Sequence, residues 1–217
     1  MPAAVIFDLD GVLMDSEQRW HAAREGLVRE TGGRWRDDAP TVMMGMSSPE
    51  WSAYLRDALS VPMDADRISR EVVRRMEEGY RRGLPLLPGA GDAVRTLAER
   101  WPLGLASSAN REIIDLVLEL AEFGTAFQVT LSSEEVERGK PAPDVYLEVA
   151  RRLAVEASSC VAIEDSSNGL RSAAAAGMSV IAVPNAHYPP EEDALALAAA
   201  SVTVVGEITP ALVERVA

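Results

Sequence analysis

Ala3-Ala4-Val5-Ile6-Phe7-Asp8-Leu9-Asp10-Gly11-Val12 opens the chain as an apolar run that ends in two carboxylates and a glycine. The apolar run over 3–9 predicts a buried strand, and Gly11 predicts a sharp turn directly after it. Two carboxylates at i and i+2 in such a turn can both reach one reaction centre. Taken alone, the pair could equally be an acidic turn without any chemistry.

Similar apolar runs recur later in the chain and alternate with helical patterns. Strands are expected at 103–106, 127–131, 160–163, 179–183 and 202–205. Helices are expected at 91–100, 111–122, 143–153 and 169–176. Strands that alternate with helices indicate a parallel sheet covered on both faces, and such sheets bind ligands at the carboxyl ends of their strands. We therefore expect an α/β fold.

The segment between the first strand and Leu84 shows helical periodicity and no convincing strand. Apolar residues share one helical face in three parts of it: Trp20, Ala23 and Leu27; Trp51, Leu55 and Leu59; and Ile68, Val72, Met76 and Tyr80. An all-helical insert after the first strand predicts a lid over the site, and the proline-containing segment 84–89 provides the return. We expect a lid domain at 15–83 and a core domain made of 1–14 and 84–217.

Composition argues against several classes of partner. The 217 residues carry a formal net charge of −13, which would repel a nucleic-acid backbone. The lone Cys160 cannot form an intramolecular disulfide, no apolar run approaches the ~18 residues of a membrane span, and the start lacks a basic leader. We expect a cytoplasmic protein without nucleic-acid or membrane partners, and a monomer as its simplest state.

Three more polar clusters follow predicted strands. The segment Ser107-Ser108-Ala109-Asn110 could cradle a phosphate at a helix start, or could only cap that helix. Lys140, held between a glycine and a proline, could neutralise a nucleophile and a phosphate together, or could be a solvated loop lysine. Glu164 and Asp165 could bind a hard cation or could favour a helix start. Each cluster taken alone allows its simpler interpretation. Helix capping does not explain why an acid pair, a hydroxyl cluster, a lysine and a second acid pair each follow a different predicted strand.

Together these clusters resemble the motifs of the haloacid dehalogenase superfamily, specifically its phosphatase branch close to β-phosphoglucomutase. Four motifs match in order and approximate spacing: Asp8-Leu9-Asp10-Gly11-Val12, Ser107-Ser108, Lys140-Pro141 and Glu164-Asp165. The resemblance covers essentially the whole chain. It implies a Rossmann-like parallel sheet core with helices on both faces and a helical cap in the position of the lid.

The resemblance also implies the roles of individual residues in a Mg²⁺-dependent reaction. Asp8 would attack phosphorus and form an aspartyl-phosphate, while Asp10 would act first as acid and then as base. Mg²⁺ would be held by Asp8, the Asp10 backbone carbonyl and Asp165, with Glu164 as a direct or water-mediated ligand. The phosphate-binding positions would be Ser107, Ser108, Asn110 and Lys140. A raised pKa is expected for Asp10, which must be protonated when the alcohol leaves.

The reaction that the resemblance favours is hydrolysis of a small phosphorylated metabolite, with a sugar or polyol phosphate as the leading substrate class. Dehalogenases that resemble this chain lack the second aspartate, so Asp10 argues for phosphate chemistry. A mutase of the β-phosphoglucomutase type is the alternative. Such mutases carry a cap histidine at the position of Trp20, and in this chain the histidine, His21, comes one residue later. They also carry basic residues in the cap loop, whereas residues 43–48 of this chain include no lysine or arginine. A non-catalytic binding or regulatory protein is a weaker alternative.

Several other residues have open interpretations. Trp20, Met43, Met44 and Met46 could form an apolar substrate surface or could fill the contact between lid and core. Five arginines could reach an anionic substrate or could be solvated helix residues: Arg24, Arg74, Arg75, Arg81 and Arg82. Cys160 is expected in the core and His187 in an exposed loop.

Overall fold

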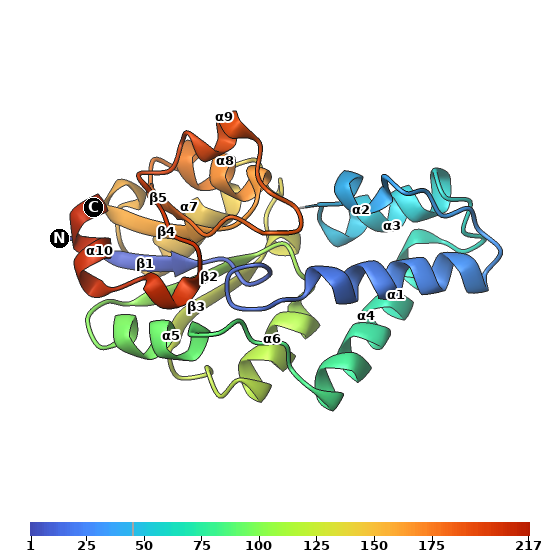
Figure 1. The fold of residues 1–217 in the computed structure, drawn as a ribbon, viewed down its shortest axis with the longest axis horizontal. Helices are drawn as coiled ribbons and strands as arrows, with labels where there is room; N and C mark the ends of the chain where they lie inside the picture. The colour runs from blue at the N-terminus through green and yellow to red at the C-terminus, as the bar shows by residue number, and fades with distance from the viewer. Residues whose placement is uncertain (45) are drawn as a thin grey trace.

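A parallel sheet forms the centre of the computed structural model, which describes residues 1–44 and 46–217 (Figure 1). Its strands are β1 (Ala4–Phe7), β2 (Leu103–Ser107), β3 (Phe127–Ser132), β4 (Cys160–Glu164), β5 (Ser179–Ala182) and β6 (Ala200–Ser201). All neighbours pair in parallel, in the order β3-β2-β1-β4-β5-β6. Because the strand order reverses beside β1, its carboxyl end is the switch point where such sheets bind ligands. The predicted α/β fold is confirmed.

Helices surround the sheet and also form the segment between β1 and β2. They are α1 (Glu17–Glu30), α2 (Ala39–Val42), α3 (Ser48–Asp57), α4 (Ala65–Arg82), α5 (Ala90–Ala98), α6 (Arg111–Leu120), α7 (Asp144–Arg152), α8 (Ser167–Ala175), α9 (Glu192–Leu195) and α10 (Pro210–Val216), with short 3-10 helices η1 (Ser133–Glu135), η2 (Ala157–Ser159) and η3 (Val205–Glu207). Within the described ranges, no helix combines the length and the apolar character that crossing a bilayer requires.

The two faces of the sheet bury alternate residues of β1. Val5 and Phe7 belong to the apolar cluster that contains residues of α5, α6 and α10. Ala4 and Ile6 belong to a second cluster, formed with residues of α7 and α8. Successive side chains of a strand point to opposite faces, so a strand covered on both sides needs an unbroken apolar run. This requirement explains the opening sequence of the chain.

The helices α1 to α4 extend from the carboxyl end of β1, on the side away from both termini (Figure 1). Helix α4 packs against α1 and α3, and it buries the predicted face that contains Ile68, Val72 and Met76. Its start is set by Asp64, whose side chain accepts a hydrogen bond from the Arg67 N–H at 2.8 Å. The apolar cluster on one face of the sheet continues into these helices.

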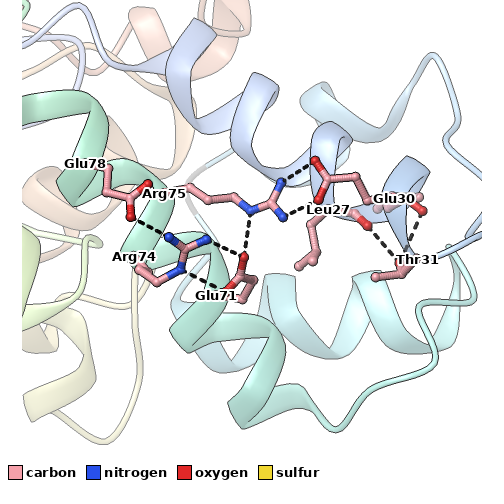
Figure 2. Close-up of polar contacts among 8 residues, drawn as sticks. Leu27, Glu30, Thr31, Glu71, Arg74, Arg75 and Glu78 are labelled. Atoms are coloured by element: carbon pink, nitrogen blue, oxygen red, sulfur yellow. Dashed lines mark hydrogen bonds and ion pairs between the residues drawn. The ribbon is translucent and has the colours of Figure 1, made fainter. Parts of the chain in front are cut away.

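Two of the arginines considered as anion ligands are instead paired on the surface of α4. Figure 2 shows Arg75 between Glu30 of α1 and Glu71 of its own helix, with a distance of 2.6 Å from Arg75 Nη2 to Glu30 Oε2. Arg74 pairs with Glu71 and Glu78. Exposed pairs of this kind contribute at most about 1 kcal/mol each, so they add little to stability. Arg81 and Arg82 are exposed.

One predicted strand was wrong. Strand β6 contains only Ala200 and Ser201, and residues 202–205 lead into η3 instead of forming the strand. The Thr203 N–H donates to the Glu207 side chain at 3.0 Å, which turns the chain away from β5. Within residues 202–205, only the Val202 N–H still donates to β5, at 2.9 Å to the Ala182 carbonyl, and Val205 is buried as part of η3. Cys160 is buried at the start of β4 and His187 is exposed, as expected.

Candidate active site

Lys140 joins side chains from separate motifs at the carboxyl ends of the strands. Its Nζ donates to Asp8 Oδ1 at 2.6 Å, to Glu164 Oε1 at 2.5 Å and to the Ala106 carbonyl at 3.0 Å. All three donors of the ammonium are therefore used. Burial alone would lower the pKa of Lys140, but the charges of Asp8 and Glu164 outweigh it and raise this pKa above its ordinary value. Lys140 is therefore a permanent buried cation beside Asp8.

Three buried acids lie beside this cation. Asp8, Glu164 and Asp165 each offer a carboxylate oxygen, and these oxygens lie within 4.8 Å of one another. Burial, strengthened by the neighbouring carboxylates, raises the pKa values of Asp8 and Asp165 well above their ordinary range. Closely spaced carboxylates in a buried site need positive charge beyond a single lysine. An oxygen donor set of this kind fits a hard divalent cation such as Mg²⁺.

Two glycines make room for these acids. A Cβ on Gly11 would lie 1.8 Å from Asp165 Oδ2, and the backbone of Gly11 has a φ of +80°. A Cβ on Gly169 would lie 1.9 Å from Glu164 Oε2. Any side chain at either position would displace a carboxylate. These glycines are therefore part of the site, although they contribute no functional group.

Glu164 is held by neighbours that the sequence did not indicate. Its Oε1 accepts hydrogen bonds from the Tyr146 hydroxyl at 2.6 Å and from Lys140, and its Oε2 accepts the Asp165 N–H at 3.1 Å. Both oxygens of this fully buried carboxylate are engaged. Tyr146 was predicted only as part of a helix. Helical periodicity indicates that a residue faces the core, but it does not indicate which group its hydroxyl contacts. This arrangement orients Glu164 toward Lys140.

Asp10 points toward the start of α1. Its Oδ1 accepts hydrogen bonds from the Ser16 hydroxyl and from Trp20 Nε1, the latter at 3.4 Å. Burial raises the pKa of Asp10 in spite of these hydrogen bonds and of the nearby positive charges of Arg24 and Lys140. The raised pKa favours the protonated form that a general acid needs. Ser16 was missed, because a serine before a helix signals only a cap.

The hydroxyl cluster after β2 is divided between two environments. Ser108 lines the cavity beside Asp8, and its buried hydroxyl has no partner among the described residues. Ser107 is fully buried, and its Oγ accepts the Ala109 N–H at 3.0 Å. Asn110 stands at the start of α6, but its side chain donates to Glu134 at 3.0 Å and does not cap the helix. Phosphate binding by these three residues stays a prediction.

The site lies in a cavity of about 50 Å³ between the sheet and the inserted helices. Its lining includes Asp8, Asp10, Lys140 and Asp165 from the sheet side, and Glu17, Trp20, Arg24, Met43, Met44, Met46 and Trp51 from the insert. The four apolar residues singled out in the sequence therefore border the site. Gly45, in the loop considered with them, lies outside the described residues. His21 turns away, because it stacks on Trp35 and contacts Glu25.

Comparison with known proteins agrees with this geometry. The model of the haloacid dehalogenase-like hydrolase family matches residues 5–183. The chain belongs to this family. Hexitol phosphatase B of Escherichia coli (strain K12) is 34% identical over 189 residues, which cover 83% of each chain. A probable pseudouridine-5'-phosphatase of Drosophila melanogaster is 31% identical over 194 residues, covering 86% of this chain and 84% of that protein.

A solved structure shares the whole fold. The crystal structure of CbbY from Rhodobacter sphaeroides in complex with phosphate superposes with a TM-score of 0.87 at 27% identity, covering 99% of this chain and 100% of that one. The predicted family, its Rossmann-like fold and the enzyme class of phosphohydrolase are confirmed.

Proposed function

We propose that the chain is a Mg²⁺-dependent phosphatase that hydrolyses a small sugar or polyol phosphate through an aspartyl-phosphate on Asp8. The observation that carries this proposal is the contact of Asp8 with Lys140 beside the buried acids Glu164 and Asp165. A carboxylate at a strand end, with a cation beside it and a second cation site adjacent, is suited to attack on an anionic ester. The phosphatase names of two relatives support the substrate class.

The proposed reaction has two displacements at phosphorus. An oxygen of Asp8 attacks phosphorus while the bond to the ester oxygen breaks, and Asp10 gives its proton to that leaving oxygen. Asp10, now a carboxylate, takes a proton from water, and the resulting hydroxide attacks the phosphoryl group on Asp8. The bond from Asp8 to phosphorus then breaks, which releases inorganic phosphate and restores both aspartates. Lys140 stays bound to Asp8 and reduces the repulsion between nucleophile and phosphate.

The acids beside Lys140 define the proposed metal position. Asp8, Asp165 and the Asp10 backbone carbonyl would hold Mg²⁺, and Glu164 would act through water because its oxygens are already engaged. The cation would supply positive charge between the nucleophile and the phosphate. Asn185 donates to Asp165 Oδ2 at 3.4 Å and would help to hold this ligand in place.

The inserted helices would act as a cap that closes on a small substrate. We assign the cap to 15–83 and the core to 1–14 and 84–217. Contacts that join the parts include two beyond those of Asp10: Asn168 Nδ2 donates to the Met44 carbonyl at 3.3 Å, and Gln18 Nε2 lies 3.2 Å from His187 Nε2. A cavity of about 50 Å³ holds a few water molecules, so a substrate enters only when these contacts open.

A phosphosugar mutase is the competing function. It needs a group in the cap that exchanges a proton with the bound sugar, and Trp20 occupies the expected position. The Trp20 indole donates to Asp10 but cannot act as a base. His21 contacts Glu25 outside the cavity. These contacts favour hydrolysis.

The decisive experiment measures phosphate release from a broad panel of phosphorylated metabolites, with Mg²⁺ and with excess chelator. We expect release that requires Mg²⁺, and Asp8→Asn should abolish it while the protein stays folded. Asp92→Asn is the matched control, because Asp92 is exposed on α5. An active Asp8→Asn enzyme would contradict the mechanism. Conversion of β-glucose 1-phosphate to glucose 6-phosphate without release would favour the mutase, and no turnover at all would favour a binding protein.

A further inference from the structure

Arg24 of α1 is a buried cation at the edge of the active-site cavity. Its side chain is only 9% exposed, and its guanidinium carbon lies 4.9 Å from the ring centroids of both Trp20 and Trp51. Its buried Nε has no hydrogen-bond partner, and no ion pair involves Arg24 among residues 1–44 and 46–217. Burial lowers the pKa of Arg24 to about 10, so the group still carries its charge at neutral pH.

Glu17 lies seven residues, about two helical turns, before Arg24 and lines the same cavity. It accepts no side-chain hydrogen bond and forms no ion pair with Arg24 in the described part of the chain. Burial and the charge of Asp10 raise the pKa of Glu17 to about 7. Arg24 is buried and Glu17 is partly buried, and because they do not pair with each other they leave donors and acceptors that a ligand can satisfy.

The two indoles restrict where Arg24 can form hydrogen bonds. The N–H groups of Arg24 lie in the plane of its guanidinium, and the indoles of Trp20 and Trp51 pack beside this group and limit the directions in which it can donate. Arg24 therefore offers donors to the cavity and Glu17 offers acceptors. A hydroxyl group can accept from Arg24 and donate to Glu17 at the same time.

We propose that Arg24 and Glu17 form a subsite that binds hydroxyl groups of the leaving alcohol, so that the preferred substrate is the monophosphate of a neutral polyhydroxylated chain. This inference rests on the proposed phosphatase function. The indoles of Trp20 and Trp51 would exclude water around the subsite and contact the C–H surface of the chain.

Charge balance selects a neutral leaving group over one with a second phosphate. The sheet-side cation Lys140 is already shared by Asp8 and Glu164. A second phosphate would bring about two negative charges close to Asp10 and Glu17, with Arg24 as its counter-charge. A hydroxyl brings no charge and satisfies both unpaired groups.

The experiment compares three substrates in the presence of Mg²⁺: a hexitol 6-phosphate, p-nitrophenyl phosphate, which has no hydroxyl on its leaving group, and fructose 1,6-bisphosphate. The variants are Arg24→Met, which keeps a long apolar side chain against the indoles, and Glu17→Gln. Arg29→Met is the matched control, because Arg29 is an exposed arginine of the same helix. kcat and KM are measured for each pair.

We expect each site variant to lower kcat/KM for the hexitol phosphate by about tenfold to a hundredfold, chiefly through KM, because Arg24→Met removes a charged donor and Glu17→Gln replaces a charged acceptor by a neutral amide. The loss for p-nitrophenyl phosphate should be at least about tenfold smaller than the loss for the hexitol phosphate, and wild type should prefer the hexitol phosphate to the bisphosphate. Equal losses on the hexitol and nitrophenyl esters would overturn the subsite. A wild-type preference for the bisphosphate that Arg24→Met abolishes would also overturn it.

Failure of the phosphatase proposal has a different signature, which is the absence of Mg²⁺-dependent turnover of every ester by wild type. The subsite can then still be tested by direct binding of the hexitol phosphate to Asp8→Asn protein, with and without Arg24→Met. Weaker binding in the double variant supports the subsite, and unchanged binding overturns it.

Discussion

Replacing Tyr146 by phenylalanine isolates the hydrogen bond that supports the acidic centre. The Tyr146 hydroxyl donates to Glu164 Oε1 at 2.6 Å, and both side chains are fully buried. The substitution removes one oxygen atom and leaves the ring in place, so it creates almost no cavity. Glu164 keeps the Lys140 and Asp165 donors, but its charge becomes less well solvated by the protein.

The magnitude follows from the type of hydrogen bond. Hydrogen bonds to charged groups contribute about 1.5–3 kcal/mol, and we expect Tyr146→Phe to lower the free energy of unfolding by that amount. For a chain of this size such a loss corresponds to a fall in Tm of roughly 3–12 °C.

Tyr54 provides the matched control. Its hydroxyl is also buried but has no hydrogen-bond partner in the described part of the chain. Tyr54→Phe removes the same atom without breaking a bond, and its free energy of unfolding should change by less than about 0.5 kcal/mol or increase. Urea unfolding of both variants gives the two values, and equal m-values confirm that only stability differs. Similar losses in both variants, or no loss in Tyr146→Phe, would refute the reasoning.

Three further substitutions test other parts of the structure. Gly11→Ala places a Cβ 1.8 Å from Asp165 Oδ2 and should abolish Mg²⁺-dependent turnover. The control is Gly32→Ala, because Gly32 has a similar φ of +78° but open space around it. This control should lower the free energy of unfolding by only about 1–2 kcal/mol in thermal unfolding. A Gly11→Ala enzyme with normal turnover would contradict this assignment. The pKa of Glu17 is raised from 4.5 to about 7, so stability is greatest while the group is protonated and is lost as the pH rises through about 7. Glu17→Gln should therefore be more stable than wild type above pH 7, by at most about 3 kcal/mol, and should lose this advantage near pH 4. Urea unfolding at several pH values measures the difference, and a difference that does not change with pH would contradict the prediction. Arg75→Met, which breaks an exposed contact with α1, should lower the free energy of unfolding by less than about 1 kcal/mol, and a larger loss would show that this contact anchors the insert.

Local patterns were sufficient for most of the fold. The apolar run before Asp8 is fully buried in β1, and alternation of strands with helices correctly predicted a parallel sheet. The same patterns failed at residues 202–205, where burial of Val205 resembles a strand signal. An apolar residue reports burial, and it does not distinguish pairing with a strand from packing below a turn.

Residue order also predicted which groups gather at the switch point, because the carboxyl ends of parallel strands meet at one edge. Asp8, Lys140, Glu164 and Asp165 come together there. Their detailed partners depended on packing between distant segments. The Tyr146 hydroxyl reaches Glu164 only because α7 packs on the face of the sheet that contains Ile6.

The order of elements, the family and the chemical groups at the strand ends follow from residue type and from spacing along the chain. Packing between distant segments set the rest: Asp10 turns toward Ser16, Glu164 is occupied by hydrogen bonds, and Arg24 is buried against two indoles. Arg24 is a helical arginine like Arg74 and Arg75 of α4, but those two form ion pairs on the surface. Within the described residues, Arg24 is buried and unpaired because α1 packs against the site. The spacing of residues along a helix does not reveal such contacts, because they are made with segments that are distant in the sequence.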